Sequence, residues 1–158
     1  MTKLPAWCTT GFLVLQNKKE LLLQLLSVQN EGGTAATLHA QANLLWLYRD
    51  DAAYHTYHHA AQLYRQENNL RAALAVYQQL QALQPTDKEV VLPLIFVALE
   101  LCDAACVTAQ LTELNKRGEN GKISKEEAVH IQQQVIKRCE LLARQGIAHA
   151  PTAEELSL

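Results

Sequence analysis

The sequence predicts an all-α protein: antiparallel helical hairpins stacked in a row as a short α-solenoid, covered at the end by a C-terminal capping helix. Composition is the first reason. Leu, Ala, Gln, Glu and Lys dominate, and all of them are well tolerated in helices, whereas 6 glycines and 4 prolines in 158 residues are few for the turns of a sheet-rich fold. The second reason is that helix-start and helix-stop signals recur along the chain with only short linkers between them. Short linkers force neighbouring helices to run antiparallel.

The bulk numbers also exclude several classes of function. Hydrophobic residues make up 49% and charged residues 19%, which is typical of a globular chain. A net charge of −2 provides no basic face for nucleic acid, and no apolar stretch approaches the ~18 residues that span a membrane. The four cysteines form no CxxC pair and residues 1–16 lack a secretory signal pattern, so we expect a cytoplasmic protein with reduced thiols.

Seven helices follow from the start and stop signals. They are expected at Lys18–Gln29, Ala35–Tyr48, Ala52–Glu67, Leu70–Leu83, Lys88–Leu101, Ala104–Arg117 and Lys125–Gln145. Residues 1–16 are interpreted as a lead-in, 17–146 as the helical domain and 147–158 as a flexible tail.

Each start has a side chain suited to capping the free N–H groups of a first turn. The expected caps are Asn17, Thr34, Asp50 or Asp51, Thr86, Asp103 and Ser124. Three of these caps have a Glu three residues later, the spacing of a capping box, in which cap and Glu bond reciprocally. The helices are expected to stop at Glu31-Gly32-Gly33, Asn68-Asn69, Gln84-Pro85, residues 118–121 and Gly146.

Pro93 is the one residue that conflicts with this assignment. Inside a regular helix a proline removes a hydrogen bond and clashes with the preceding turn, at a cost of ~3 kcal/mol. Either the helix over 88–101 is kinked at Pro93, or it begins later than its cap suggests.

Apolar and small residues recur at an interval of 34 positions. Tyr57, Tyr64, Leu70, Ala73, Tyr77 and Leu80 correspond to Val91, Ala98, Ala104, Val107, Leu111 and Leu114. A fixed period of this length is the mark of a repeat architecture.

Residues 54–87 resemble a tetratricopeptide repeat, whose pattern is W-x2-L-G-x2-Y, then A-x3-F, then P. The chain reads Tyr57-x2-Ala60-Ala61-x2-Tyr64, then Ala73-x3-Tyr77, then Pro85. Residues 88–121 match as a degenerate repeat and residues 20–53 more loosely. The resemblance implies that 125–145 is the capping helix that covers the last repeat.

The resemblance implies a concave groove lined by one helix of each hairpin, where such proteins hold a segment of a partner. By the family pattern its lining residues are His55, His58, Gln62, Arg65, Glu89, Leu92, Phe96 and Leu99. The relatives that bind a C-terminal carboxylate carry Lys and Asn where this chain has His58 and Gln62, so an apolar client segment is expected instead. The alternative for Phe96 and Leu99 is that they are core residues packed against the helix over 125–145.

No pattern points to a cofactor, a metal ion or a catalytic centre. His55, His58 and His59 share a helix face, but a zinc site needs three or four ligands. Cys102, Cys106 and Cys139 are interpreted as packing residues, because free cysteine is among the most buried residue types. There is no phosphate-binding loop, GxGxxG or GxSxG. We therefore expect a protein that is not an enzyme and holds no cofactor.

In length, repeat number and expected groove, the chain resembles bacterial type III secretion chaperones. This implies a cytoplasmic chaperone or adaptor that binds a segment of a client protein. The apolar stretch Leu21–Leu26 suggests a homodimer through the N-terminal helices. The alternative function is a structural subunit of a larger assembly, with outward residues such as Leu45 and Trp46 as permanent contacts.

Overall fold

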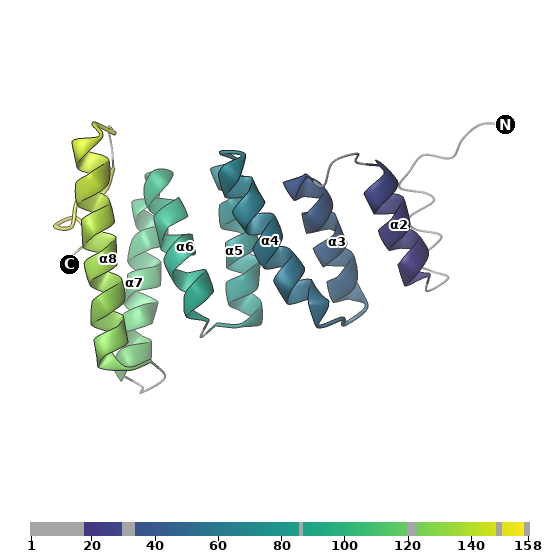
Figure 1. Cartoon of the computed structure of the whole chain (residues 1–158). Coiled ribbons are helices and arrows are strands. Elements are labelled where there is room, and N and C mark those ends of the chain that lie inside the picture. The colour runs from purple at the N-terminus through teal and green to yellow at the C-terminus, as the bar shows by residue number, and fades with distance from the viewer. Residues whose placement is uncertain (1–17, 30–33, 86, 120–122, 148–149, 157–158) are drawn as a thin grey trace. The chain divides into compact units, whose positions relative to one another are not determined.

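The computed structural model describes residues 18–29, 34–85, 87–119, 123–147 and 150–156, and in these ranges the protein is all-α (Figure 1). Seven helices and no strand are present in this part of the chain. The helices are α2 (Lys19–Gln29), α3 (Ala35–Leu47), α4 (Ala52–Gln66), α5 (Leu70–Leu83), α6 (Lys88–Glu100), α7 (Ala104–Glu119) and α8 (Lys125–Arg144). The all-α prediction is confirmed. The lead-in and its cap Asn17 lie outside the described residues.

Most of the predicted caps make the expected bonds. The Thr34 hydroxyl accepts from the Thr37 N–H at 3.3 Å, the Asp103 carboxylate accepts from the Cys106 N–H at 2.9 Å, and Ser124 with Glu127 forms a capping box at the start of α8. Thr86 lies outside the described residues, and the cap of α6 is the next residue, Asp87.

Asp50 or Asp51 was predicted as the cap of α4, and both residues contribute to the start of this helix in different ways. Asp51 occupies the cap position without a side-chain bond. The Asp50 carboxylate instead accepts from the Ala52 N–H at 2.9 Å and forms an ion pair with Lys19 of α2. Asp50 thus stabilises the start of α4 by a hydrogen bond and holds the start of α2 through an ion pair.

Three helices end on a left-handed residue that is not glycine. Arg49, Asn68 and Cys102 follow α3, α4 and α6 with φ of 54°, 57° and 56°. After α3 and after α6, the next two N–H groups donate hydrogen bonds to carbonyls in the last turn of the helix. The first of these bonds joins the Arg49 N–H to the Trp46 carbonyl after α3, and the Cys102 N–H to the Leu99 carbonyl after α6. These bonds satisfy the last carbonyls of each helix, so the chain can reverse within a few residues.

The chain divides into two compact units, residues 1–67 and residues 68–158, called here the N-terminal and the C-terminal unit. The boundary falls inside the predicted repeat 54–87, so α4 belongs to the first unit and α5 to the second. The repeat's small and aromatic residues are all buried: Tyr57, Ala60, Ala61, Tyr64, Ala73 and Tyr77. Their pairing across the boundary stays a prediction.

In the N-terminal unit, α3 and α4 form an antiparallel hairpin. The Tyr57 hydroxyl donates to Asn43 Oδ1 at 2.7 Å, and the His39 ring lies edge-on to both Tyr57 and Tyr64, with ring centres 5.9 Å apart in each pair. Burial raises the pKa of both tyrosines, and the nearby Glu67 carboxylate adds to the rise for Tyr64. These rings therefore act as neutral packing groups between the two helices.

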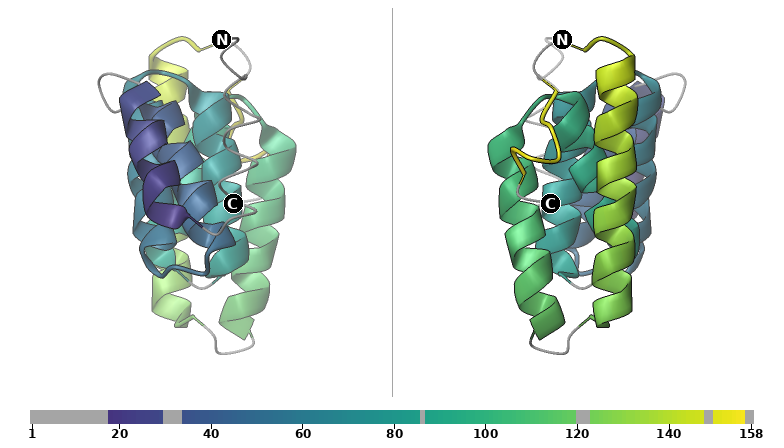
Figure 2. Two further views of the ribbon diagram at one scale, coloured as in Figure 1. Left: turned by 90° about the vertical axis from the view of Figure 1, so that its right-hand side faces the viewer. Right: turned by 90° about the vertical axis from the view of Figure 1, so that its left-hand side faces the viewer.

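In the C-terminal unit, α8 packs on both α6 and α7, and α5 packs on α6. Figure 2 shows α7 and α8 side by side at this end of the chain. Hydrogen bonds between amide side chains add to the packing: Gln81 donates to Gln110 at 2.6 Å, joining α5 to α7, and Gln132 donates to Asn115 at 2.8 Å, joining α8 to α7. The core is formed mainly by Val91, Ile95, Ala98, Leu99, Val107, Leu111, Leu114, Ile131, Val135, Cys139 and Leu142.

Pro93 lies inside α6, which begins at Lys88. The alternative of a later start is therefore wrong. The Asp87 carboxylate accepts from the Glu89 N–H at 2.9 Å and fixes the first turn before the proline is reached.

The expected flexible tail is wrong for residues 150–156. Pro151 is buried, and Leu156, 4% exposed, belongs to the core of the C-terminal unit. The Thr152 N–H donates to the Glu155 carboxylate at 2.8 Å, and the Glu155 N–H donates to the Thr152 hydroxyl at 3.2 Å. These two bonds close a turn that directs Leu156 inward. Hydrophobic burial of one leucine overrides the polar composition that suggested a loose end.

Within the described ranges, none of the helices has the length and apolar character needed to cross a membrane.

Candidate partner-binding site

A pocket of about 430 Å³ lies in the C-terminal unit, between α6 and α8. It is called here the α6–α8 pocket, and its lining residues are Leu92, Glu126, Glu127, His130, Ile131 and Gln134. One residue comes from α6 and five from α8. Leu92 is the residue that connects this pocket to the groove predicted from the sequence.

Contacts along the two helices show that α6 and α8 run in the same direction. Leu92 shares the pocket with Ile131 near the start of both helices. Further on, Glu100 forms an ion pair with Arg138. Because the contacts advance along both helices together, the first turns of α6 and α8 lie at the same end of the C-terminal unit.

The pocket combines an apolar floor with a polar rim. Ile131 is buried and Leu92 is half-buried, so both present aliphatic surface. A hydrogen bond of 2.7 Å joins Nε2 of the His130 ring to the side-chain amide nitrogen of Gln134. Glu126 is exposed in the first turn of α8. A floor of aliphatic side chains with a few polar groups is typical of sites that bind side chains of a ligand.

Glu127 has a second role in the same turn. Its carboxylate accepts from the Ser124 N–H at 3.3 Å, while the Glu127 N–H donates to the Ser124 hydroxyl at 3.1 Å. This capping box holds the first turn of α8 in place beside Leu92. The rim of the pocket is therefore positioned by the same bonds that begin the helix.

Arg138 covers α6 beyond the pocket. Its guanidinium lies over the Phe96 ring, 5.9 Å from the ring centre, and one of its nitrogens pairs with Glu100. The Arg138 Nε is buried and has no hydrogen-bond partner among the described residues. Stacking on an aromatic ring suits a weakly hydrated guanidinium group. Phe96 is thus a packing surface for α8.

The structure separates the four groove residues predicted on α6. Glu89 is exposed, Leu92 lines the pocket, and Phe96 is half-buried beneath Arg138. Leu99 is fully buried in the core, which leaves it no exposed surface to line a groove; its packing against α8 stays a prediction. Leu99 faces the core because it lies one turn before the reversal at Cys102, where α7 folds back over α6.

The four groove residues predicted on α4 belong to the N-terminal unit. His55 and Gln62 are exposed, and His58 and Arg65 are half-buried. Tyr54 lies near both histidines, with ring centres 6.0 Å from His55 and 6.3 Å from His58. A continuous groove from α4 to α6 stays a prediction, since these residues lie in a different unit from Leu92.

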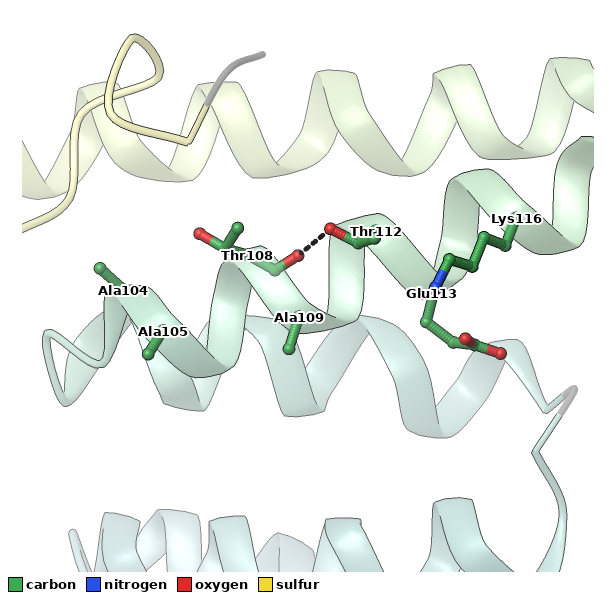
Figure 3. A pocket seen from close by; sticks show the side chains of 7 residues that line it. All are labelled: Ala104, Ala105, Thr108, Ala109, Thr112, Glu113 and Lys116. Atoms are coloured by element: carbon green, nitrogen blue, oxygen red, sulfur yellow. Dashed lines mark hydrogen bonds between the residues drawn. The ribbon is translucent and has the colours of Figure 1, made fainter.

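A second, open depression lies along α7. It measures about 600 Å³ and is lined by Ala104, Ala105, Thr108, Ala109, Thr112, Glu113 and Lys116. Figure 3 shows that these side chains all project from the one helix, with the Thr112 hydroxyl donating to the Thr108 carbonyl at 2.8 Å. The Glu113 carboxylate is already paired with Arg117 at 3.0 Å.

Two of the cysteines in the described residues are held as protonated thiols. Burial raises the pKa of the Cys106 thiol, with a further contribution from Asp103, and burial likewise raises that of Cys139. A raised pKa keeps the thiol protonated and poorly nucleophilic. In the same part of the chain, no three His, Cys, Asp or Glu side chains gather in a way that would hold a metal ion.

Apolar side chains remain exposed on the N-terminal unit. Trp46 is 53% and Leu47 is 59% exposed at the end of α3, and Leu21 on α2 is 46% exposed. Single exposed apolar residues are common, but tryptophan is enriched among the residues that contribute most to protein–protein contacts, so the exposed Trp46 is the stronger candidate for a contact.

In comparisons with known proteins, no family model, no curated protein and no solved structure matches this chain.

Sequence reasoning missed the five α8 residues of the pocket. The repeat pattern predicts the helix over 125–145 only as a cover for the last repeat, and a covering helix carries no expected groove residues. A signal was present: Ile131 and Val135 are spaced as core residues, which places His130 and Gln134 beside that face rather than opposite it. Aligning this helix with the first helix of a repeat would have placed these residues next to Leu92.

Proposed function

We propose that the protein is a non-catalytic helical-repeat chaperone or adaptor that binds a segment of a partner protein in the α6–α8 pocket. The observation that carries the proposal is the position of Leu92. This residue was predicted from the repeat pattern to line a groove, and it lies at the α6 side of a 430 Å³ pocket with an aliphatic floor.

The packing of the C-terminal unit supports a repeat architecture. In a stack of helical hairpins, the first helix of each hairpin packs against both helices of the hairpin before it. α8 packs in this way on α6 and α7, and it runs in the same direction as α6. On this proposal, α6 and α8 are equivalent helices of successive repeats, and the binding surface lies between them.

The resemblance to type III secretion chaperones in length and repeat number suggests the kind of client. On this proposal the client carries a hydrophobic segment, which suits the aliphatic floor of the pocket. On this proposal the protein acts in the cytoplasm, where it shields that segment.

Affinity purification from the source cell followed by mass spectrometry tests the proposal. Leu92→Gln replaces one of the two aliphatic side chains of the floor with a polar one of similar volume, and Val129→Gln makes the same kind of change at a 49% exposed position of α8 that does not line the pocket. We expect a client that is recovered with the wild type and with Val129→Gln, and is reduced at least tenfold with Leu92→Gln. Equal recovery with both variants, at unchanged melting temperature, would refute the pocket as the binding site.

The exposed Trp46 and Leu47 favour a second candidate function, a structural subunit of a larger assembly. An apolar surface of this kind, if permanently covered by a neighbour, makes the isolated chain prone to aggregate. We then expect the chain expressed alone to aggregate, and Trp46→Gln combined with Leu47→Gln to restore a monodisperse sample. A wild-type chain that stays monodisperse at high concentration would argue against this candidate.

A further inference from the structure

The charged residues that line the α6–α8 pocket are of one sign. Both charged residues that line it, Glu126 and Glu127, are carboxylates, and no lysine or arginine does so. Glu89, in the first turn of α6, is exposed at the same end of the C-terminal unit because α6 and α8 run in the same direction. The apolar floor therefore borders an acidic rim on one side.

The capping box makes the two carboxylates of α8 unequal. Glu127 is engaged by the Ser124 N–H, whereas Glu126 is exposed at the rim. The ring of His130, the other titratable group that lines the pocket, is bonded to Gln134. Glu126 is thus the carboxylate best placed to meet a cation carried by a ligand.

Glu126 and Ile131 line the same pocket from successive turns of α8. They lie five positions apart, roughly 7.5 Å along the helix axis, and they reach the pocket from different sides of α8. A segment that packs on Ile131 therefore brings its neighbouring side chains within reach of Glu126. The pocket volume of about 430 Å³ is near the lower end of the ligand-site range of roughly 300–1,000 Å³, which suits side chains of a short segment.

We propose that the α6–α8 pocket selects a partner segment with an aliphatic side chain next to a basic one. The aliphatic side chain packs on Leu92 and Ile131, and a nearby lysine or arginine of the same segment pairs with Glu126. The inference rests on the proposed function, since it names the chemistry of the partner for the same site. It commits to a basic and apolar peptide rather than to a second copy of the chain.

Selection of phage-displayed random peptides on the full-length chain tests the inference. Peptides retained by the wild type and lost on Leu92→Gln are bound at the pocket. We expect them to share an aliphatic residue with lysine or arginine within a few positions of it. Enriched peptides with no charge preference, or with acidic residues near the aliphatic one, would overturn the inference and leave the proposed function standing.

A charge reversal then tests Glu126 itself, with the best selected peptide as the probe. Exchanging its basic residue for Glu should weaken binding to the wild type about fivefold, the upper range for an exposed ion pair. Glu126→Lys should weaken binding of the original peptide by a similar factor and restore binding of the exchanged one. Glu140→Lys, an exposed position on the same helix outside the pocket, is the control for net charge and should change neither.

Two results separate the failure of the inference from the failure of the proposed function. If Leu92→Gln abolishes binding and Glu126→Lys has no effect, the pocket binds a partner but does not select a basic residue. If no selected peptide depends on Leu92, or if the chain self-associates in light scattering and Leu92→Gln makes it monomeric, the proposed peptide site is itself refuted.

Discussion

At the scale of single residues, the helix ends carry the clearest local strain in the molecule. Arg49, Asn68 and Cys102 adopt left-handed backbone, which costs a residue with a side chain roughly 1–2 kcal/mol. Asparagine tolerates this conformation best, and Asn68 was predicted as a linker residue. Nothing in Arg49 or Cys102 signals a left-handed turn, because their conformation is imposed by packing of the helices on either side.

Arg49→Gly should therefore stabilise the protein. Glycine removes the left-handed penalty but loses more backbone entropy on folding, which leaves a net gain of about 0.5–1 kcal/mol. Arg49→Ala is the matched control, since it removes the same exposed side chain and keeps the penalty. Urea denaturation of the three proteins measures the difference. Equal stability of the Gly and Ala variants would show that Arg49 is not held in this conformation.

The charge of Asp50 should make the stability of the protein depend on pH. The hydrogen bond from Lys19 lowers the pKa of this carboxyl below its ordinary value of 3.8, and the Ala52 N–H lowers it further. A lowered pKa in the folded state stabilises the fold above the unfolded-state pKa, and this contribution is lost as the pH falls through the folded-state value.

Asp50→Asn should then destabilise the protein at about pH 6, and the difference from the wild type should shrink as the pH falls below the ordinary carboxyl pKa towards the lowered folded-state value. Denaturation curves at about pH 6 and across the acidic range give the comparison. Asp51→Asn, at the neighbouring exposed position with no cap bond, is the control and should show little dependence. A difference that persists unchanged at the lower pH would contradict the role of the charge.

At the scale of elements, every helix in the described residues was predicted from start and stop signals, and α7 extends two residues beyond the predicted end. The cap of α6 was placed one residue early because Thr86 and Asp87 are both good capping residues, and local sequence does not choose between them. Leu92 of the pocket was predicted. Its partners on α8 were not, because which face of a helix is left uncovered depends on packing between elements distant in sequence.

Ser124→Ala should show how much the capping box contributes to α8. Loss of a serine cap costs about 1 kcal/mol, and here it also releases Glu127 at the rim of the pocket. Ser124→Asp keeps an acceptor at the cap and is the matched control. We expect faster hydrogen exchange in the first turn of α8 for the Ala variant only. Unchanged exchange in that turn would mean that packing alone holds it.

At the scale of the whole molecule, the repeat pattern predicts one continuous stack of helices over residues 17–146. The fold has two compact units, and the boundary between them follows Glu67. The division falls in the repeat with the best sequence match. Repeat patterns report which residues are buried, and Tyr64 and Tyr77 are buried as predicted. They do not report how strongly successive hairpins adhere, because that depends on contact area between them.

Self-association through the N-terminal helices is the prediction that belongs to this scale. Leu21 is 46% exposed on α2, next to the fully buried Leu22, so an apolar side chain is available for contact with a second copy. Light scattering should give twice the mass of one chain, and Leu21→Glu should halve it. Leu141→Glu, at a 41% exposed leucine of α8, is the control. A wild-type chain that is monomeric at micromolar concentration would remove the dimer.

The burial of Leu156 affects how shortened versions of this protein should be designed. A fragment trimmed after Gly146, where the last long helix has ended, would look complete on a helix map but would leave an apolar hole in the C-terminal unit. Filling it accounts for roughly 1.5–3 kcal/mol, the value of burying one leucine side chain. Truncation for crystallisation, and fluorescent or affinity fusions at this end, should therefore preserve residues through 156 and add a spacer after them.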